Sequence, residues 1–210
     1  FLSVNRRKVW QQKFNNFKES DYETNRIIIK ARDGQKIPVS LIYKKGITLN
    51  SAPLLMYGYG AYGLIIEPSF KFSFLPLVDD GFIFAIAHIR GGQDLGREWY
   101  DQGRMMNKMN TFFDFIDCTK GLHKKNFGNK EKTFAMGGSA GGLLMGAIIN
   151  IEPTLYKGIV SAVPFVDVLT TMSDESIPLT TFEYKEWGNP NNKKEYFYIK
   201  KYSPYDNIDF

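Results

Sequence analysis

A serine flanked by glycines is the feature of this sequence with the clearest chemical meaning. Residues 137–141 read Gly-Gly-Ser-Ala-Gly and match the G-x-S-x-G nucleophile elbow, in which a sharp strand-to-helix turn exposes the serine hydroxyl. The apolar segments Thr133–Met136 and Leu143–Ile149 predict that strand and that helix. The alternative is an ordinary glycine-rich turn. We favour Ser139 as a nucleophile, because the pattern places glycine where a side chain would clash with the neighbouring helix or strand.

A second glycine pattern, G-x-G-x-x-G, occupies residues 58–63 after the apolar run Pro53–Tyr57. It could indicate a dinucleotide site, but such a motif must open a helix. The next stretch, Leu64–Phe74, contains Pro68 and has little helical periodicity, and no acidic residue ends the following strand where a ribose would need one. We therefore expect no nucleotide cofactor. These glycines would instead let the loop pass close to the nucleophile and offer hydrogen bonds to an oxyanion.

Both histidines of the chain precede Ser139. We expect His88, which follows an apolar strand, to be packed, and His123, which lies beside two lysines at the end of an amphipathic helix, to be exposed. In α/β-hydrolases the catalytic triad runs along the chain as nucleophile, acid and histidine. These 210 residues alone cannot complete a triad in that order. Asp167 is a conceivable acid, but a capping or turn role is the stronger expectation.

Several carboxylates gather late in the chain: Asp174, Glu175, Glu183 and Glu186. A glycosidase would need two of them at a defined separation in space, which spacing in the sequence does not give. We expect most of them to be solvated. One of them could line a pocket for a cationic substrate group, since a buried guanidinium needs a carboxylate partner.

The composition describes one globular domain of ordinary size. The 210 residues are 43% apolar and 15% aromatic, which supports a core and excludes intrinsic disorder. A single cysteine, Cys118, excludes a disulfide scaffold and, with two histidines, a zinc site. No apolar run reaches the roughly 18 residues of a membrane span. The net charge of +5 comes from dispersed basic residues, so we expect a solvated surface and no nucleic-acid partner.

Six apolar segments predict strands: Arg26–Lys30, Lys36–Tyr43, Pro53–Tyr57, Phe82–Ile89, Lys132–Met136 and Lys157–Val163. Asp33-Gly34 between the first two predicts an antiparallel hairpin. Pro38 lacks a backbone N–H and favours an edge position for the second strand. Continuous apolar runs are typical of parallel strands that are covered on both faces.

Helices are predicted between residues 107 and 125 and at residues 140–150, in alternation with the strands. This alternation predicts an α/β fold with a parallel centre and an antiparallel hairpin at its start. On the first helix, Asp114 and Asp117 fall off the apolar stripe, and we expect both in solvent.

Four strings together resemble the prolyl oligopeptidase family of serine peptidases: residues 56–60 (MYGYG), 89–92 (IRGG), 137–142 (GGSAGG) and 163–167 (VPFVD). Three further stretches are similar to its oligopeptidase B branch: residues 174–181, 186–190 and 202–207. The resemblance runs from about Ile27 to the last residue. It implies an α/β-hydrolase fold truncated after about six of eight strands, a peptidase without cofactor or metal, and a cytoplasmic location.

The resemblance also assigns roles to single residues. Ser139 would be the nucleophile, and the Tyr59 hydroxyl would form the oxyanion hole with the backbone N–H of Ala140. Tyr62 would stand at the wall of the primary specificity pocket. There Glu183 would hold the Arg or Lys that precedes the scissile bond.

Two positions depart from the family pattern. Glu67 matches one of two acids associated with a second basic residue of the substrate, but the other position is Ser69. The acid expected two residues after Glu183 is Lys185. Both departures point to weaker selection for basic residues, and above all for pairs of them.

The chain begins at Phe1 without methionine or a signal-type apolar stretch, as though cut from a longer protein. The resemblance implies that residues 1–24 are the end of a missing β-propeller and a linker, and that residues 25–210 are a partial α/β-hydrolase domain. The family's acid and histidine would lie beyond Phe210. Partners would then be short basic peptides, together with the propeller and C-terminal strands of the parent chain, and no membrane.

Two interpretations of function follow. In the first, the chain is part of a serine oligopeptidase that cleaves short peptides after Arg or Lys through an acyl-enzyme on Ser139, and the 210 residues alone are inactive. In the second, it is a truncated inactive gene product or a non-catalytic interaction fragment. The histidines upstream of the nucleophile are the residues that leave both interpretations open.

Overall fold

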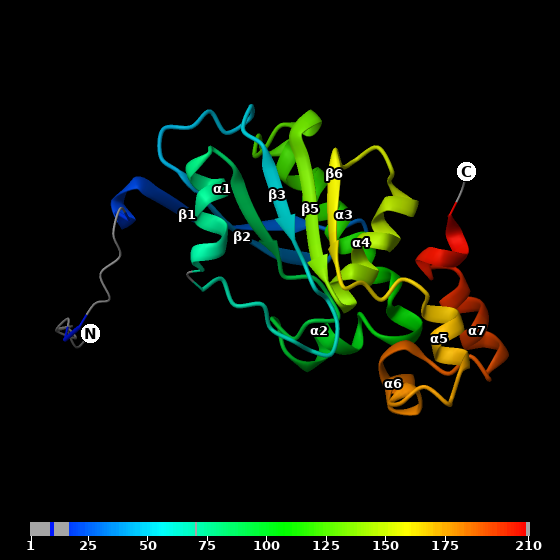
Figure 1. The fold of residues 1–210 in the computed structure, drawn as a ribbon. Coiled ribbons are helices and arrows are strands. Elements are labelled where there is room, and N and C mark those ends of the chain that lie inside the picture. Colours follow the sequence, from blue (N-terminus) through cyan, green and yellow to red (C-terminus); the bar gives the residue numbers. More distant parts are fainter. Residues whose placement is uncertain (1–8, 11–16, 70, 209–210) are drawn as a thin grey trace.

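A six-stranded mixed sheet forms the centre of the protein (Figure 1), seen in a computed structural model that describes residues 9–10, 17–69 and 71–208. The strand order is β1-β2-β4-β3-β5-β6. The strands are β1 (Tyr22–Lys30), β2 (Lys36–Lys44), β3 (Leu54–Tyr57), β4 (Ile83–Ala87), β5 (Thr133–Gly138) and β6 (Gly158–Ala162). β1, β2 and β4 pair antiparallel, whereas β4, β3, β5 and β6 run parallel.

Helices pack on both faces of the sheet and beyond its β6 end. The α-helices are α1 (Leu75–Asp79), α2 (Arg97–Asp101), α3 (Met109–Lys124), α4 (Ala140–Ile151), α5 (Val168–Ser173), α6 (Thr180–Trp187) and α7 (Lys193–Lys200). α3 contacts β1 and β2, α4 contacts β5 and β6, and α1 contacts β2 and β4. Figure 1 shows α5, α6 and α7 grouped beyond β6. Short 3₁₀ helices are η1 (Glu19–Asp21), η2 (Phe72–Phe74), η3 (Met105–Asn107), η4 (Lys130–Lys132) and η5 (Pro204–Asn207).

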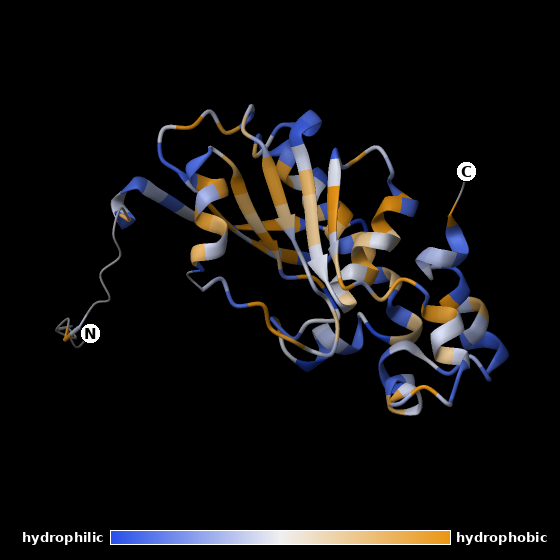
Figure 2. Ribbon diagram, in the orientation of Figure 1, coloured by the Kyte–Doolittle hydropathy of each residue, from blue (hydrophilic) through white to orange (hydrophobic). Residues whose placement is uncertain are grey.

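The sheet separates two apolar clusters. Alternate residues of β3 face opposite ways: Leu54 and Met56 join the large core under α3 and α4, whereas Leu55 joins a smaller cluster with Phe84 and Val78 on the α1 face. Because both faces are covered, the central strands are apolar at successive positions. Figure 2 shows this, with the central strands and α4 among the most apolar segments of the ribbon.

The structure confirms the predicted α/β fold, the six strands and the parallel centre. The predicted hairpin is also present: β1 and β2 pair over their whole length, and Gly34 in the turn has a φ of 91°, which glycine adopts without strain. Of the segment 1–24, expected to be a propeller end and linker, residues 1–8 and 11–16 lie outside the described residues.

The edge position expected from Pro38 is wrong, because β2 lies between β1 and β4. The ladder between β2 and β4 covers only residues 39–42 of β2, so Pro38 lies just beyond it. The backbone N–H of His88 still donates to the Pro38 carbonyl. The His88 carbonyl, which an N–H at position 38 would satisfy, accepts from the Trp99 indole instead, at 3.0 Å. The side chain thus replaces the donor that proline lacks.

Asp114 was expected in solvent and is fully buried, so that expectation is wrong. Its carboxylate accepts hydrogen bonds from the backbone N–H, Nε and Nη2 of Arg90. Arg90 also pairs with Asp33 in the hairpin turn, at 2.7 Å. Asp117, also expected in solvent, is only 13% exposed and pairs with Arg32 at 2.8 Å, so that expectation is wrong too. The apolar periodicity of the helix predicts the wrong environment for Asp114, because periodicity assumes that charged residues face solvent. A carboxylate that pairs with a guanidinium through two hydrogen bonds can instead be buried.

Three general features limit the chemistry of this domain. No helix in the described ranges is long and apolar enough to cross a bilayer. Among those same residues, no group of three His, Cys, Asp or Glu side chains is placed to hold a metal ion. Cys118 is free and buried, and burial raises the pKa of its thiol. The thiol therefore stays protonated and weakly nucleophilic at neutral pH.

Candidate active site at the β5–α4 turn

Ser139 occupies the turn that joins β5 to α4, as the sequence predicted. It is the single residue between Gly138 and Ala140, it is exposed, and its backbone has a φ of 57° and a ψ of −117°. Such a conformation costs a non-glycine residue about 1–3 kcal/mol and is typical of functional sites. Its backbone N–H donates to Ala162 at the end of β6, at 2.9 Å. The sheet thereby holds the serine above its carboxyl edge.

The glycines around Ser139 are required by close backbone contacts. A Cβ at Gly137 would lie 2.3 Å from the Gly141 carbonyl oxygen, and a Cβ at Gly141 would lie 2.8 Å from the Gly58 carbonyl oxygen. Backbone atoms cannot yield as a flexible side chain can. The predicted clash is therefore confirmed, and the two glycine motifs of the sequence meet at this turn.

Tyr59 and Ala140 provide the two donors predicted for an oxyanion hole. The Tyr59 side chain lies near Ser139. Burial raises the pKa of the Tyr59 hydroxyl and outweighs Ser139, which acts to lower it, so the hydroxyl keeps the proton that it would donate. Ala140 is the first residue of α4, where a backbone N–H has no partner within the helix. Both donors lie beside the serine, and their catalytic role remains a prediction.

Tyr62, Glu183 and Trp187 form a hydrogen-bonded cluster between the loop after β3 and α6. The Tyr62 hydroxyl and the Trp187 indole both donate to Oε2 of Glu183, at 2.8 and 3.0 Å. The rings of Tyr62 and Trp187 meet edge to face, with centroids 5.6 Å apart. Oε1 of Glu183 has no hydrogen-bond partner among the described residues. The cluster therefore offers one free carboxylate oxygen beside aromatic rings, which suits a cationic side chain.

A buried lysine and a buried glutamate contact the loop that follows β3. Lys108 is 1% exposed and its ammonium donates to the Gly60 carbonyl, at 2.6 Å. Glu186 accepts from the Tyr62 backbone N–H at 3.0 Å and from the Tyr100 hydroxyl. The Lys108 ammonium lies 4.0 Å from the Glu186 carboxylate. The pair thus clamps the segment that carries both Tyr59 and Tyr62.

The clamp was not found from the sequence. Lys108 looks like a solvated lysine at the start of an amphipathic helix, and Glu186 was expected among mostly solvated carboxylates. Burial lowers the pKa of Lys108 to about 8, while Glu186 acts in the opposite direction. The only sequence signal was the position of Glu186, three residues after Glu183 and so on one side of a helix.

Other predicted site residues lie elsewhere. Glu67 and Ser69 line a separate pocket over β1 and β2, and neither contacts Glu183. Lys185 is exposed on α6. Asp167 caps α5 by accepting from the Thr170 N–H, as expected. The structure therefore brings together the residues predicted to bind the first basic side chain. Glu67 and Ser69, at the positions associated with a second basic side chain, lie together in a different place.

Neither histidine serves Ser139 in this structure. His88 is buried, as expected, and hydrogen-bonds Ser40 and Asp94. His123 was expected to be exposed, but it is 9% exposed and hydrogen-bonds Thr133. Lysines next to it in sequence reach solvent, while its own ring points to the base of β5. That expectation is wrong because a residue at a helix end can still face the sheet.

Comparison with known proteins shows the family of this chain. The profile of the prolyl oligopeptidase family matches residues 68–209. Dipeptidyl aminopeptidase BI of Pseudoxanthomonas mexicana is 53% identical over 205 residues, which are 97% of this chain and 28% of that protein. Protease 2 of Moraxella lacunata is 48% identical over 194 residues, 92% of this chain and 28% of that protein.

The solved structures agree. Oligopeptidase B from Leishmania major superimposes with a TM-score of 0.90 at 48% identity, covering 92% of this chain and 27% of that one. The match includes the α/β-hydrolase architecture, and the chain spans about 28% of the length of its curated relatives. With a family profile over most of its residues and relatives near 50% identity, the chain belongs to the prolyl oligopeptidase family.

Proposed function

We propose that this chain carries the nucleophile and primary specificity pocket of a serine endopeptidase that cleaves short peptides after Arg or Lys. One observation carries the proposal: Ser139 stands exposed between β5 and α4 on a backbone with a φ of 57°. Membership of a peptidase family supports the same reaction class. The oligopeptidase B resemblance also favours a cytoplasmic location.

The geometry suits acyl transfer. Ser139 Oγ would attack the scissile carbonyl carbon, and its proton would pass to a histidine and then to the leaving amine. The Tyr59 hydroxyl and the Ala140 N–H would stabilise the oxyanion in each tetrahedral intermediate. Water would then hydrolyse the acyl-enzyme by the same route in reverse.

The base for this reaction would come from outside the 210 residues. Both histidines of the chain are held by other partners, and Asp167 is used as a helix cap. We therefore propose that the chain alone is inactive as a peptidase. We also propose that residues 1–24 lead from a β-propeller, and that further strands would complete the domain beside β6, whose Val160 is 53% exposed.

Selectivity for Arg or Lys would rest on Glu183. Its Oε1 is free among the described residues, and its Oε2 is fixed by Tyr62 and Trp187, so the carboxylate is oriented before substrate arrives. A preoriented carboxylate binds a guanidinium with little further ordering cost. Selection for two successive basic residues is not part of this proposal, because Glu67 lies in a different pocket.

Two proteins test the proposal together. The first is the 210-residue chain. The second is a hybrid in which the chain replaces the matching 194-residue segment of Moraxella lacunata Protease 2. On an Arg-ended peptide p-nitroanilide, we expect turnover by the hybrid and no Ser139-dependent turnover by the chain. A folded hybrid without activity would favour the interaction-fragment alternative, and turnover by the chain alone would contradict the missing-base argument.

Tyr59→Phe is expected to lower kcat of the hybrid by about 100-fold, because one oxyanion donor is typically worth about 3 kcal/mol. KM should change little, since the hydroxyl would act in the transition state. Steady-state kinetics on the Arg-ended substrate measure both constants. Tyr57→Phe, two residues earlier at the end of β3, is the matched control. An unchanged kcat for Tyr59→Phe would show that the Tyr59 hydroxyl is not a donor of the oxyanion hole.

Lys185→Glu is expected to lower the KM of the hybrid for an Arg substrate by a few-fold. The exposed Lys185 ammonium lies two residues from Glu183 on α6 and opposes a cationic substrate. The effect should shrink as salt is added, because exposed charges are screened. Lys193→Glu at the start of α7 makes the same charge change away from this helix. Equal effects of the two substitutions would show only a general charge effect.

A further inference from the structure

Ser40, His88 and Asp94 form a second hydrogen-bonded series away from Ser139. The Ser40 hydroxyl lies 2.8 Å from Nε2 of His88, and Nδ1 of His88 lies 2.8 Å from Oδ1 of Asp94. The side chains of His88 and Asp94 are 1% and 6% exposed. This is the order and spacing of a hydroxyl, a base and an orienting carboxylate.

The partners of His88 determine which of its nitrogens carries the proton. An ionised carboxylate only accepts hydrogen bonds, so Nδ1 must donate to Asp94. Nε2 of the neutral ring is then an acceptor, and Ser40 must be the donor. The hydroxyl proton of Ser40 is therefore directed at a base whose tautomer is fixed by a buried carboxylate.

The sheet holds this series rigidly. Ser40 lies in the middle of β2 and His88 directly follows β4, its neighbouring strand. The His88 backbone is fixed on both sides, since its N–H donates to Pro38 and its carbonyl accepts from Trp99. A base held by strand pairing keeps its distance to the hydroxyl without an ordering cost.

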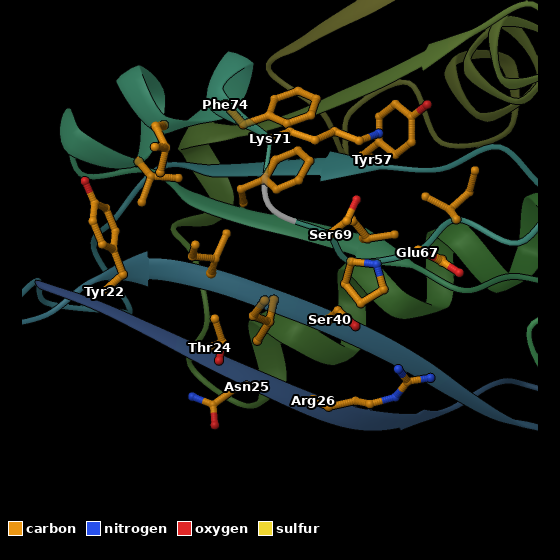
Figure 3. Close-up of a pocket in the computed structure, with 18 of the residues that line it drawn as sticks. Tyr22, Thr24, Asn25, Arg26, Ser40, Tyr57, Glu67, Ser69, Lys71 and Phe74 are labelled. Carbon is orange, nitrogen blue, oxygen red and sulfur yellow. The ribbon is translucent and has the colours of Figure 1, made fainter. Parts of the chain in front are cut away.

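Ser40 opens into a cavity of about 710 Å³. Ser40 is partly exposed. Figure 3 shows it on strand β2 at one side of the pocket, with Glu67 and Ser69 on the opposite side. Most of the remaining lining is apolar or aromatic: Tyr22, Ile42, Tyr57, Phe74, Phe84 and Ile86. The cavity is therefore large enough for a small ligand and suited to an apolar group.

A cationic residue lies opposite Ser40 on the neighbouring strand. Arg26 of β1 is directly opposite Ser40 in the strand register and lines the same cavity. Directly opposed residues have Cβ atoms about 5 Å apart. The Arg26 side chain has no hydrogen bond or ion pair with the residues that the structure describes. It is available to stabilise negative charge that develops next to Ser40.

We propose that Ser40 is a second nucleophile, which takes an acyl group from carboxylic esters with an apolar acyl chain. Ser40 Oγ bonds to the acyl carbon while its proton passes to Nε2 of His88. The bond between the acyl carbon and the ester oxygen then breaks, and the departing alkoxide receives that proton. The products are an acyl-serine at residue 40 and the free alcohol.

This site is independent of the proposed peptidase reaction. His88 cannot act on Ser139, because both of its nitrogens are engaged by Ser40 and Asp94. Ester reactivity at Ser40 requires only residues within this chain. A failure of one proposal leaves the other standing, and replacement of Ser40 or Ser139 tells them apart.

The test treats the 210-residue chain with p-nitrophenyl butyrate, follows nitrophenolate release, and locates the butyryl group by peptide mass mapping. We expect butyrylation of Ser40 at least about 100-fold faster than that of Ser51, an exposed serine that donates to the Thr48 carbonyl and has no base. Ser40→Ala should abolish the burst of nitrophenolate, and Ser161→Ala should leave it unchanged.

Two further variants test whether Ser40 reacts because His88 activates it or only because it is exposed. Asp94→Asn keeps the shape but favours the wrong tautomer, and it should slow acylation by about 10²- to 10⁴-fold. The exposed Arg26→Gln should slow it without affecting the fold, which circular dichroism checks. Labelling of Ser40 no faster than Ser51 in the folded chain, or butyrylation at Ser139 instead, would overturn the proposal.

Discussion

In the hybrid with Protease 2, Ser139→Ala is expected to lower kcat for the Arg-ended substrate by about 10⁴-fold or more. The reason is that an acyl-enzyme cannot form without the hydroxyl, and the remaining oxyanion donors accelerate only a slow attack by water. KM should stay within a few-fold, since Glu183 and its neighbours are untouched. Steady-state kinetics with active-site titration measure the loss.

Ser161→Ala is the matched control for this experiment. Ser161 lies on β6, beside the end of β5, and its hydroxyl donates to the Gly142 carbonyl at 3.2 Å. We expect that variant to keep kcat within about two-fold. Should Ser139→Ala retain more than a hundredth of the activity, another residue must be the nucleophile, and the elbow would be only a structural turn.

In the 210-residue chain, Glu186→Ala is expected to reduce the free energy of unfolding by about 3–5 kcal/mol. Glu186 is 3% exposed, and its loss leaves the fully buried Lys108 ammonium without its countercharge. It also removes the acceptor of the Tyr62 N–H and the Tyr100 hydroxyl. Urea unfolding followed by tryptophan fluorescence measures the change.

Two comparisons make this measurement specific. Glu98→Ala removes an exposed glutamate that accepts only from the Gln102 side chain, and it should cost less than about 1 kcal/mol. Adding Lys108→Met to Glu186→Ala should restore part of the lost stability, because the unpaired charge is then absent. Equal losses for Glu186→Ala and Glu98→Ala would exclude a clamp.

The same pair links stability to catalysis. Lys108 and Glu186 contact the loop at Gly60, next to Tyr59, and at Tyr62 itself. Glu186 is also on the same helix as Glu183. A movement of α6 would therefore shift the specificity pocket and the oxyanion loop together.

Local features of the sequence were sufficient for most of the fold. The strands and the β1–β2 hairpin follow from apolar runs and from Asp33-Gly34, and the elbow follows from five consecutive residues. These predictions succeeded because they depend on backbone conformation and neighbouring side chains. The errors concern Pro38, Asp114, Asp117 and His123. In each case a residue distant in sequence supplied the missing donor, countercharge or burial.

What the sequence determined by itself was the family and the position of the turn at Ser139, because glycine spacing at a turn is a local requirement of backbone packing. Tertiary structure decided which charged groups are buried. Lys108 meets Glu186 across 78 residues, and Ser40 meets His88 across 48 residues. Such pairs have no local signature, since the free energy that favours them arises only when the sheet and α6 bring them out of water.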